Sequence, residues 1–270
     1  MTQDDVHFFR SWFEDYSKRF PSEDAGVEAN LRYKKDHSLR VQAHMLTLGR
    51  DLKLDSNQML LAEVIGLFHD VGRFEQYVKY HTFKDHRSED HATLGLAVLE
   101  REQIFSDRLS TQEKEIVCTA IRNHNQRVIH DNVDENTLLF CKLIRDADKL
   151  DILDQVINFY EDPRRTPYLA VEGNHNDERY SPEIIEGILS GKQISYTSVK
   201  TPVDIKLIRL SWLLDLTFST ALEIAKRKHF FLRLRAFIPE TEETLKVFQY
   251  IEQRTHIVHA PSGSVCRLYT

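Results

Sequence analysis

Histidine is the residue type in this sequence with the clearest capacity for chemistry. The chain carries 13 histidines among its 270 residues, and His69 is followed directly by the carboxylate of Asp70. This pair directly follows the apolar run Val64–Phe68, which places an imidazole and a carboxylate at the end of a predicted buried helix. Adjacent side chains on a helix point about 100° apart, so both reach one ion only where the helix ends. Imidazole and carboxylate ligands together suit divalent transition metals.

A His-Asp dipeptide alone is weak evidence, because composition predicts about one such pair by chance. A second pair, His130-Asp131, lies in a polar stretch. Because loops favour His, Asp and Asn without any function, we interpret this second pair as a solvated turn.

The positions of four further residues strengthen the case for His69-Asp70. His37 is expected to open a helix, and His91 follows the predicted helix cap Ser88. His124 is expected at the end of an apolar helix, and Asp148 lies on another helix that is otherwise apolar. Each candidate ligand is thus expected on its own helix, and the helix ends can converge on one pocket.

Helical patterns dominate the segments that must position these residues. Apolar side chains recur at three- and four-residue steps, whereas strand signals are weak throughout, so we predict an all-α fold. The predicted helices lie near residues 6–20, 37–48, 56–68, 88–99, 111–124 and 134–153, and further helices begin near 182, 202 and 241. We expect the helix that starts at 202 to continue to about Leu222, and we interpret residues 161–180 as a loop.

Start and stop signals support several of these boundaries. Ser110 with Glu113 forms a capping-box pattern, and Ser181-Pro182 and Thr201-Pro202 each pair a cap with proline at the first helical position. Thr241 is expected to cap the last helix. Gly72 is expected to end the helix that carries His69, and residues 74–87 are expected to be irregular.

Composition narrows the class of protein. Apolar residues make up 41% and charged residues 29% of the chain, which is typical of a globular domain. The net charge of −6 argues against general nucleic-acid binding. The N-terminus is acidic, whereas a signal peptide would be basic and then apolar. No apolar run approaches the roughly 20 residues that span a bilayer. The three cysteines are scattered, which does not suggest a disulfide framework or a zinc knuckle. We therefore expect a cytoplasmic protein without a membrane segment.

Five separated elements of the sequence resemble, in order, the H…HD…H…H…D signature of the HD superfamily. Residues 68–73 (FHDVGR) resemble the HD turn of that family, residues 90–95 (DHATLG) resemble its next helix start, and residues 147–150 (ADKL) resemble its last element. The resemblance covers about residues 30–155. It implies an HD-domain helical bundle with additional C-terminal helices, which we expect to form a single domain over 1–270 with residues 160–270 packed on the core.

The resemblance also implies a metal site. It implies one or two divalent ions of iron, manganese, nickel or zinc, the first held by His37, His69, Asp70 and Asp148. In the six-ligand branch of the family, Asp70 bridges to a second ion, which is held by His91 and His124. Asp146 is the alternative to Asp148, and the register of the ADKL element favours Asp148.

The segment between the HD element and His91 is rich in cations and aromatic residues. Both of its ends are expected at the pocket, so its cations could grip phosphate oxygens and its aromatic rings could stack on a base. The predicted substrate-binding residues are Arg73, Lys79, Tyr80, Arg87, Arg122 and Lys149, and Tyr77 and Phe83 are further stacking candidates. His86 and Lys84 are the candidates for protonating a leaving group.

These features predict a phosphohydrolase that cuts a phosphomonoester, phosphodiester or phosphoanhydride bond of a nucleotide-like small molecule with metal-activated water. No Gly-Tyr-Pro follows the HD motif, which disfavours the HD-GYP group of cyclic-dinucleotide phosphodiesterases. A di-iron oxygenase on the same scaffold, a nucleotide-sensing module without turnover and a one-metal nucleoside monophosphatase are the alternatives. A homodimer is a further possibility that the sequence leaves open.

Overall fold

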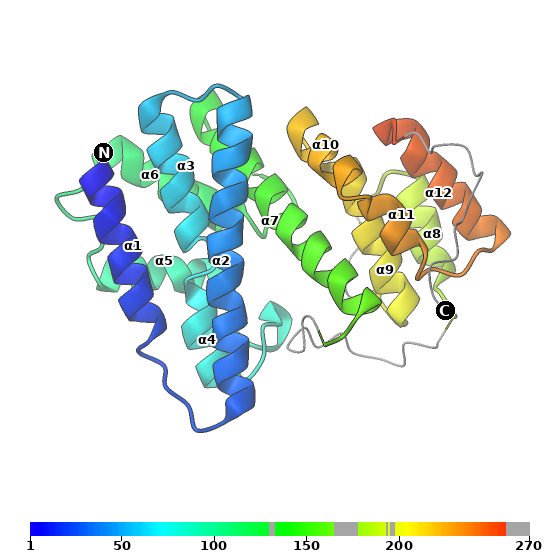
Figure 1. The fold of residues 1–270 in the computed structure, drawn as a ribbon, viewed down its shortest axis with the longest axis horizontal. Coiled ribbons are helices and arrows are strands. Elements are labelled where there is room, and N and C mark those ends of the chain that lie inside the picture. Colours follow the sequence, from blue (N-terminus) through cyan, green and yellow to red (C-terminus); the bar gives the residue numbers. More distant parts are fainter. Residues whose placement is uncertain (130–132, 165–177, 193, 195–197, 258–270) are drawn as a thin grey trace. The chain divides into compact units, whose positions relative to one another are not determined.

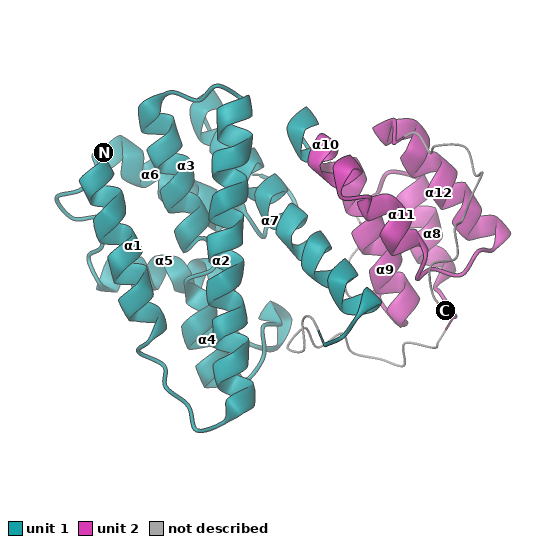
Figure 2. Ribbon diagram, viewed as in Figure 1, with its two compact units in different colours: residues 1–170, 217–221 teal, residues 171–216, 222–270 magenta. Residues whose placement is uncertain are grey.

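The computed structural model describes residues 1–129, 133–164, 178–192, 194 and 198–257, and all regular secondary structure in these ranges is helical (Figure 1). The all-α prediction is therefore confirmed. Within the described ranges, no helix combines the length and the apolar character that crossing a membrane requires. The chain divides into two compact units, residues 1–170 with 217–221 and residues 171–216 with 222–270 (Figure 2).

The first unit is a bundle in which the long helices α2 (Ala25–Asp51) and α7 (Glu135–Glu161) pack against each other, and α3 (Ser56–Phe68) packs against both. The remaining helices of this bundle are α1 (Gln3–Ser17), α4 (Gly72–Tyr80), η1 (Asp85–Arg87), α5 (His91–Arg101) and α6 (Thr111–Asn123). Aromatic rings join α1 to its neighbours, with Phe9 5.8 Å from Phe68 and Phe13 5.9 Å from Phe74.

The second unit contains α8 (Pro182–Leu189), α9 (Pro202–Ser211), η3 (Trp212–Asp215), α11 (Phe230–Arg235) and α12 (Glu242–Thr255). The proline-led starts of α8 and α9 and the Thr241 cap of α12 are as predicted. The expected helix starts near residues 182, 202 and 241 are therefore confirmed. Their packing on the core stays a prediction, and most of the predicted loop 161–180 lies outside the described residues.

Local capping explains where most helices of the first unit begin. Asp55 and Gln58 form a capping box at α3, Ser110 and Glu113 form one at α6, and Asp134 caps α7. The sequence predicts these helix starts, because each cap is a short-range interaction between a polar side chain and the first free N–H groups of the helix.

The start of α2 differs from the prediction that His37 opens a helix. Asp24 accepts hydrogen bonds from the N–H groups of Gly26 and Val27, so α2 begins at Ala25 and His37 lies in its middle. The buried residues Val27 and Leu31 extend the apolar face toward the N-terminus. This extra length also places residues before His37 on a rigid helix beside the candidate site.

The segment after the HD pair also differs from the prediction. Gly72 begins α4 instead of ending α3, and α4 occupies much of the stretch that was expected to be irregular. A Cβ atom on Gly72 would lie 2.3 Å from the carbonyl oxygen of His91, so glycine is needed for the close approach of α4 and α5. The cap of α5 is Asp90 rather than Ser88, and Ser88 instead hydrogen-bonds Gln76 and Lys84.

The predicted long helix from residue 202 to Leu222 is wrong. Helix α9 ends at Ser211, and after η3 a new helix, α10 (Ser219–Arg227), begins. The N–H groups of Thr217 and Phe218 donate to the buried carboxylate of Asp146, which removes them from any continuous helical ladder. A tertiary hydrogen bond thus overrides a helical apolar pattern.

We expect Gly72→Ala to lower the stability of the protein by about 1–3 kcal/mol, because the added methyl group overlaps backbone atoms that cannot rotate away. Thermal or urea unfolding followed by circular dichroism measures this loss. Gly95→Ala is the matched comparison. A Cβ atom on Gly95 would lie 3.2 Å from its nearest neighbours, so this substitution should lower the stability of the protein less. Equal stability of the Gly72 variant and the unsubstituted protein would contradict the close approach of α4 and α5 at Gly72.

Candidate metal centre

Six side chains that are far apart in the sequence gather within the first unit. They come from different elements: His37 from α2, His69 and Asp70 from the turn after α3, His91 from the start of α5, His124 from the residue after α6, and Asp148 from α7. All four imidazoles and the Asp70 carboxylate are buried. The structure therefore brings together all six residues that the sequence singled out as candidate metal ligands.

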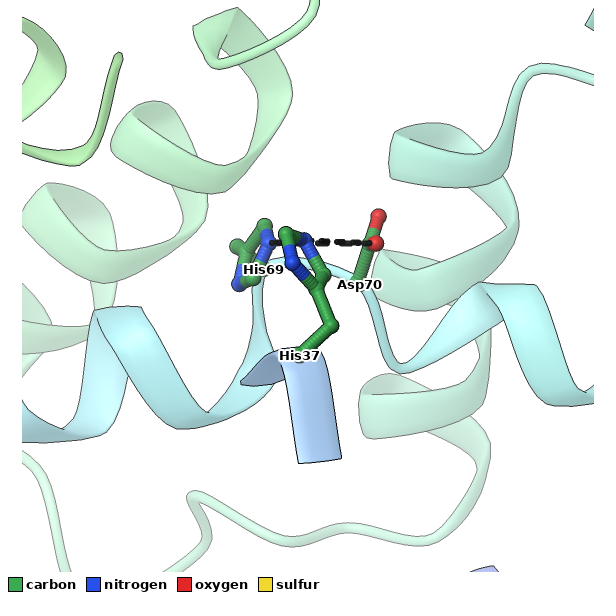
Figure 3. A group of neighbouring side chains, drawn as sticks. All are labelled: His37, His69 and Asp70. Carbon is green, nitrogen blue, oxygen red and sulfur yellow. Dashed lines mark hydrogen bonds and ion pairs between the residues drawn. The ribbon is translucent and has the colours of Figure 1, made fainter. Parts of the chain in front are cut away.

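Asp70 lies at the centre of this group and divides its two oxygens between two pairs of histidines. Its Oδ2 atom lies 3.4 Å from His37 Nε2 and 3.8 Å from His69 Nε2, and Figure 3 shows these three side chains together. Its Oδ1 atom lies 3.2 Å from His91 Nε2 and 3.8 Å from His124 Nε2. One carboxylate thus faces two neighbouring sets of ligand atoms.

Asp148 completes the set on the His37 side. Its Oδ1 atom lies 3.1 Å from His37 Nε2 and 3.8 Å from His69 Nε2. The competing carboxylate, Asp146, is occupied by the backbone N–H groups of Thr217 and Phe218. Of the two candidates, Asp148 is therefore the one that faces the histidines.

The outer nitrogen of every imidazole is held by an acceptor. His69 Nδ1 lies 2.9 Å from the Gly66 carbonyl oxygen, and His124 Nδ1 lies 2.6 Å from that of Ile121. Because a carbonyl only accepts, these two Nδ1 atoms carry the proton and donate. Their Nε2 lone pairs then point into the group, which is the arrangement of metal-binding histidines.

Carboxylates hold the other two rings in the same way. His37 Nδ1 lies 2.7 Å from Asp151 Oδ2, and His91 Nδ1 lies 2.7 Å from Asp85 Oδ2. Arg40 binds Asp151 from the other side, and Arg73 binds Asp85. Each of these histidines therefore has an anionic partner that raises its basicity and fixes its orientation.

The inward-facing atoms fit a bound cation. His91 Nε2 and His124 Nε2 lie 2.9 Å apart, and His37 Nε2 and His69 Nε2 lie 3.3 Å apart. Two lone pairs at such distances repel unless a proton or a cation lies between them. His37, His69 and Asp70 form one group able to hold an ion, and Asp70, His91 and His124 form a second. Nitrogen and carboxylate donors in these numbers suit a divalent transition metal.

Burial and charge set the protonation of these groups. Burial lowers the pKa of His124 to about 3, with a further contribution from the neighbouring His91 and His69, so His124 is neutral at physiological pH. At His37 burial acts in the same direction, but hydrogen bonds to Asp148, Asp151 and Asp70 outweigh it and raise the pKa to about 10. A metal ion on His37 therefore replaces a proton there.

Three residues close to the centre escaped the sequence analysis: Lys34, Asp85 and Asp151. Lys34 Nζ lies 2.8 Å from Asp70 Oδ2, and it precedes His37 by three residues on the same helix. Asp151 follows Asp148 by three residues, so helical spacing could have placed both residues beside their partners. Asp151 is buried and binds Arg40 as well as His37. Asp85 lies in a short 3₁₀ turn, for which the sequence carries no periodic signal.

Among the predicted substrate-binding residues, Arg73 lies nearest the centre. Its Nε atom is 3.3 Å from Asp70 Oδ1, and its Nη1 atom donates to Gln76, Asp85 and the Phe83 carbonyl. Lys79 and Tyr80 both bind Glu89 rather than a residue of the centre.

The remaining predicted residues differ in exposure. His86, Arg87 and Arg122 are exposed, and Lys84 and Lys149 are half-buried. The Lys84 carbonyl accepts hydrogen bonds from the N–H group of Arg87 and the hydroxyl group of Ser88. The roles of these residues stay predictions.

Comparison with known proteins identifies a family domain in the segment of the chain that contains the candidate metal centre. Residues 35–153 match the family model described as HD domain, and this range includes all six residues of the centre. The chain has no match among curated proteins or among solved structures.

We expect Asp151→Asn to weaken metal binding about 10- to 100-fold, because the His37 ring loses the charge of its orienting partner. Titration of the metal-free protein with Mn²⁺ measures this change. Asp154→Asn, one turn further along α7, is the matched control and should bind as the unsubstituted protein does. Equal affinities for the two variants would remove Asp151 from this role.

We expect His91→Ala to reduce the metal content from two ions per chain toward one, since it removes a ligand from only one side of Asp70. Elemental analysis of protein purified without chelator gives the count. His86→Ala, which changes an exposed histidine nearby, should keep the original count. An unchanged count in the His91 variant would exclude this residue from the centre.

Proposed function

The chain belongs to the HD superfamily through its domain at residues 35–153, and on this premise we propose that it is a metal-dependent phosphohydrolase. It hydrolyses a phosphomonoester, phosphodiester or phosphoanhydride bond of a nucleotide-like substrate. The HD family consists mainly of hydrolases that bind divalent metals, which supports a catalytic rather than a purely structural role for this centre.

One observation carries the proposal. The Asp70 carboxylate lies between two pairs of imidazoles, and all four imidazoles have their Nδ1 atoms held by acceptors on the outside. Such an arrangement supports two ions that share one carboxylate, held by His37, His69 and Asp148 on one side and by His91 and His124 on the other. A pair of ions is well suited to hydrolysis of phosphate bonds.

Bound ions supply a water of lowered pKa and neutralise the non-bridging phosphate oxygens. The side chains of the protein fix the geometry around them. Asp85 and Asp151 hold the rings of His91 and His37, and the pKa of Asp70 is kept well below its usual range, chiefly because Lys34 and neighbouring positive groups outweigh its burial. Burial of this set strengthens every electrostatic interaction with the substrate.

Aromatic side chains next to the centre support a nucleotide-like substrate. Tyr77 and Phe83 stack with ring centroids 4.4 Å apart, and both rings are half-buried. The Arg73 guanidinium lies 5.9 Å from the Phe83 ring and also binds Asp70, so the aromatic pair adjoins the candidate metal centre. A base that stacks on this pair would place its phosphate groups toward the ions.

The leaving group and the outer part of the substrate require further contacts. We propose that Lys84 or His86 delivers a proton to the leaving oxygen, because both lie on the segment between α4 and α5. Arg73, Lys79, Tyr80, Arg87, Arg122 and Lys149 remain our candidates for contacts with the phosphate chain or the base.

We expect the metal-loaded protein to release phosphate from at least one member of a panel of nucleotides, and we expect Asp70→Ala to abolish both this release and metal binding. A colorimetric phosphate assay and elemental analysis measure the two effects. Near-normal turnover by the Asp70 variant would contradict the assignment. Two bound irons with oxygen consumption and no phosphate release would instead favour an oxygenase.

A further inference from the structure

Two cations approach the two oxygens of Asp70 from opposite sides. Lys34 Nζ lies 2.8 Å from Oδ2, and Arg73 Nε lies 3.3 Å from Oδ1. Both cationic groups also lie near the ring of Phe83, at 5.2 Å for Lys34 and 5.9 Å for Arg73. The two side chains are similarly shielded, with 12% and 14% of their surface exposed.

Arg73 and Lys34 differ in the hydrogen bonds that they make in addition to the one with Asp70. Arg73 Nη1 donates to Gln76, to Asp85 and to the Phe83 carbonyl, so Arg73 stays fixed whatever binds Asp70. The Lys34 ammonium group has Asp70 as its one hydrogen-bond acceptor among the described residues. The oxygen that it occupies, Oδ2, is the one that faces His37 and His69.

A metal ion on Oδ2 would therefore compete with Lys34 for this oxygen. Both are cations, so they repel each other at short distance, and the partly buried ammonium group then needs a new anionic partner. The Phe83 ring offers a favourable surface beside the vacated position, because cations are attracted to an aromatic face. A substrate anion bound at the ions would lie within reach of a flexible lysine side chain.

The charges around the centre indicate which anion fits best. The carboxylates are Asp70, Asp85, Asp148 and Asp151, and the cations are Lys34, Arg40 and Arg73. With neutral imidazoles, two divalent ions would leave a net positive charge of three. A terminal phosphate group carries about two negative charges near neutral pH, whereas a phosphodiester carries one.

We propose that Lys34 is a placeholder for the metal and a ligand for the substrate. It neutralises Asp70 while the centre is empty of metal, and on metal binding its ammonium group moves to a terminal phosphate group of the substrate. The second half of this statement rests on the proposed phosphohydrolase activity, and the first half does not.

The two proposed roles of Lys34 predict opposite effects of Lys34→Met, namely tighter metal binding and weaker phosphate binding. In Lys34→Met, Mn²⁺ no longer competes with the ammonium group, so the metal-free full-length protein should bind Mn²⁺ about tenfold more tightly. The Mn²⁺-loaded variant should bind inorganic phosphate about 10- to 100-fold more weakly, because a charge-assisted hydrogen bond is lost. Isothermal titration calorimetry gives both constants, and Lys34→Gln should repeat both changes.

Lys35→Met is the matched control. Lys35 is the next residue on α2, carries the same charge and pairs with Glu14 instead of a residue of the centre. Both constants should stay at their original values in this variant, and circular dichroism should give the same helical content for all proteins.

Weaker or unchanged Mn²⁺ binding in Lys34→Met would overturn the placeholder role, since a merely structural lysine would not oppose the metal. Unchanged phosphate affinity, or no phosphate binding by the unsubstituted protein, would overturn the substrate role. If both constants change as expected while no nucleotide is hydrolysed, the proposed activity fails, the placeholder role of Lys34 stands, and its contact with phosphate is no longer a contact with a substrate.

Discussion

The burial of one carboxylate, Asp70, is the constraint on which the rest of the first unit depends. This side chain is only 4% exposed, and a buried ionised carboxylate is costly unless cations and hydrogen bonds compensate for it. Lys34, Arg73 and the inward Nε2 atoms of four histidines surround it. Two bound metal ions would therefore compensate the buried negative charge of this centre more completely than the protein's own groups do.

The positions of the surrounding helices follow from this requirement. Helix α2 brings Lys34 and His37 to one oxygen of Asp70, and the contact between Gly72 and α5 brings His91 to the other. The outer nitrogens of the rings are tied to carbonyl groups at helix ends or to Asp85 and Asp151. Because each tie comes from a different element, the geometry of the centre depends on the packing of the whole bundle.

Much of this could be predicted from the sequence, because its signals are local. The caps Ser110 and Thr241 marked helix starts, and the order of histidines and aspartates marked the six residues of the centre. Pairings between distant residues carry no such signal. The hydrogen bond that the Thr217 N–H group donates to the Asp146 carboxylate interrupts a helix that apolar periodicity predicts. The helix α4 differs from the sequence prediction for a similar reason, since the role of Gly72 depends on its tertiary contact with α5. The early start of α2 has a local cause instead, the cap formed by Asp24.

In the proposed centre, Asp70 is shared between two ions. Reconstitution of the metal-free protein with Mn²⁺, followed by elemental analysis and electron paramagnetic resonance of the same sample, tests this arrangement most directly. Two ions per chain with a spectrum that shows magnetic coupling between them is the result that this geometry predicts. A single uncoupled ion at saturation, or two ions without coupling, would contradict a carboxylate shared between two metal sites.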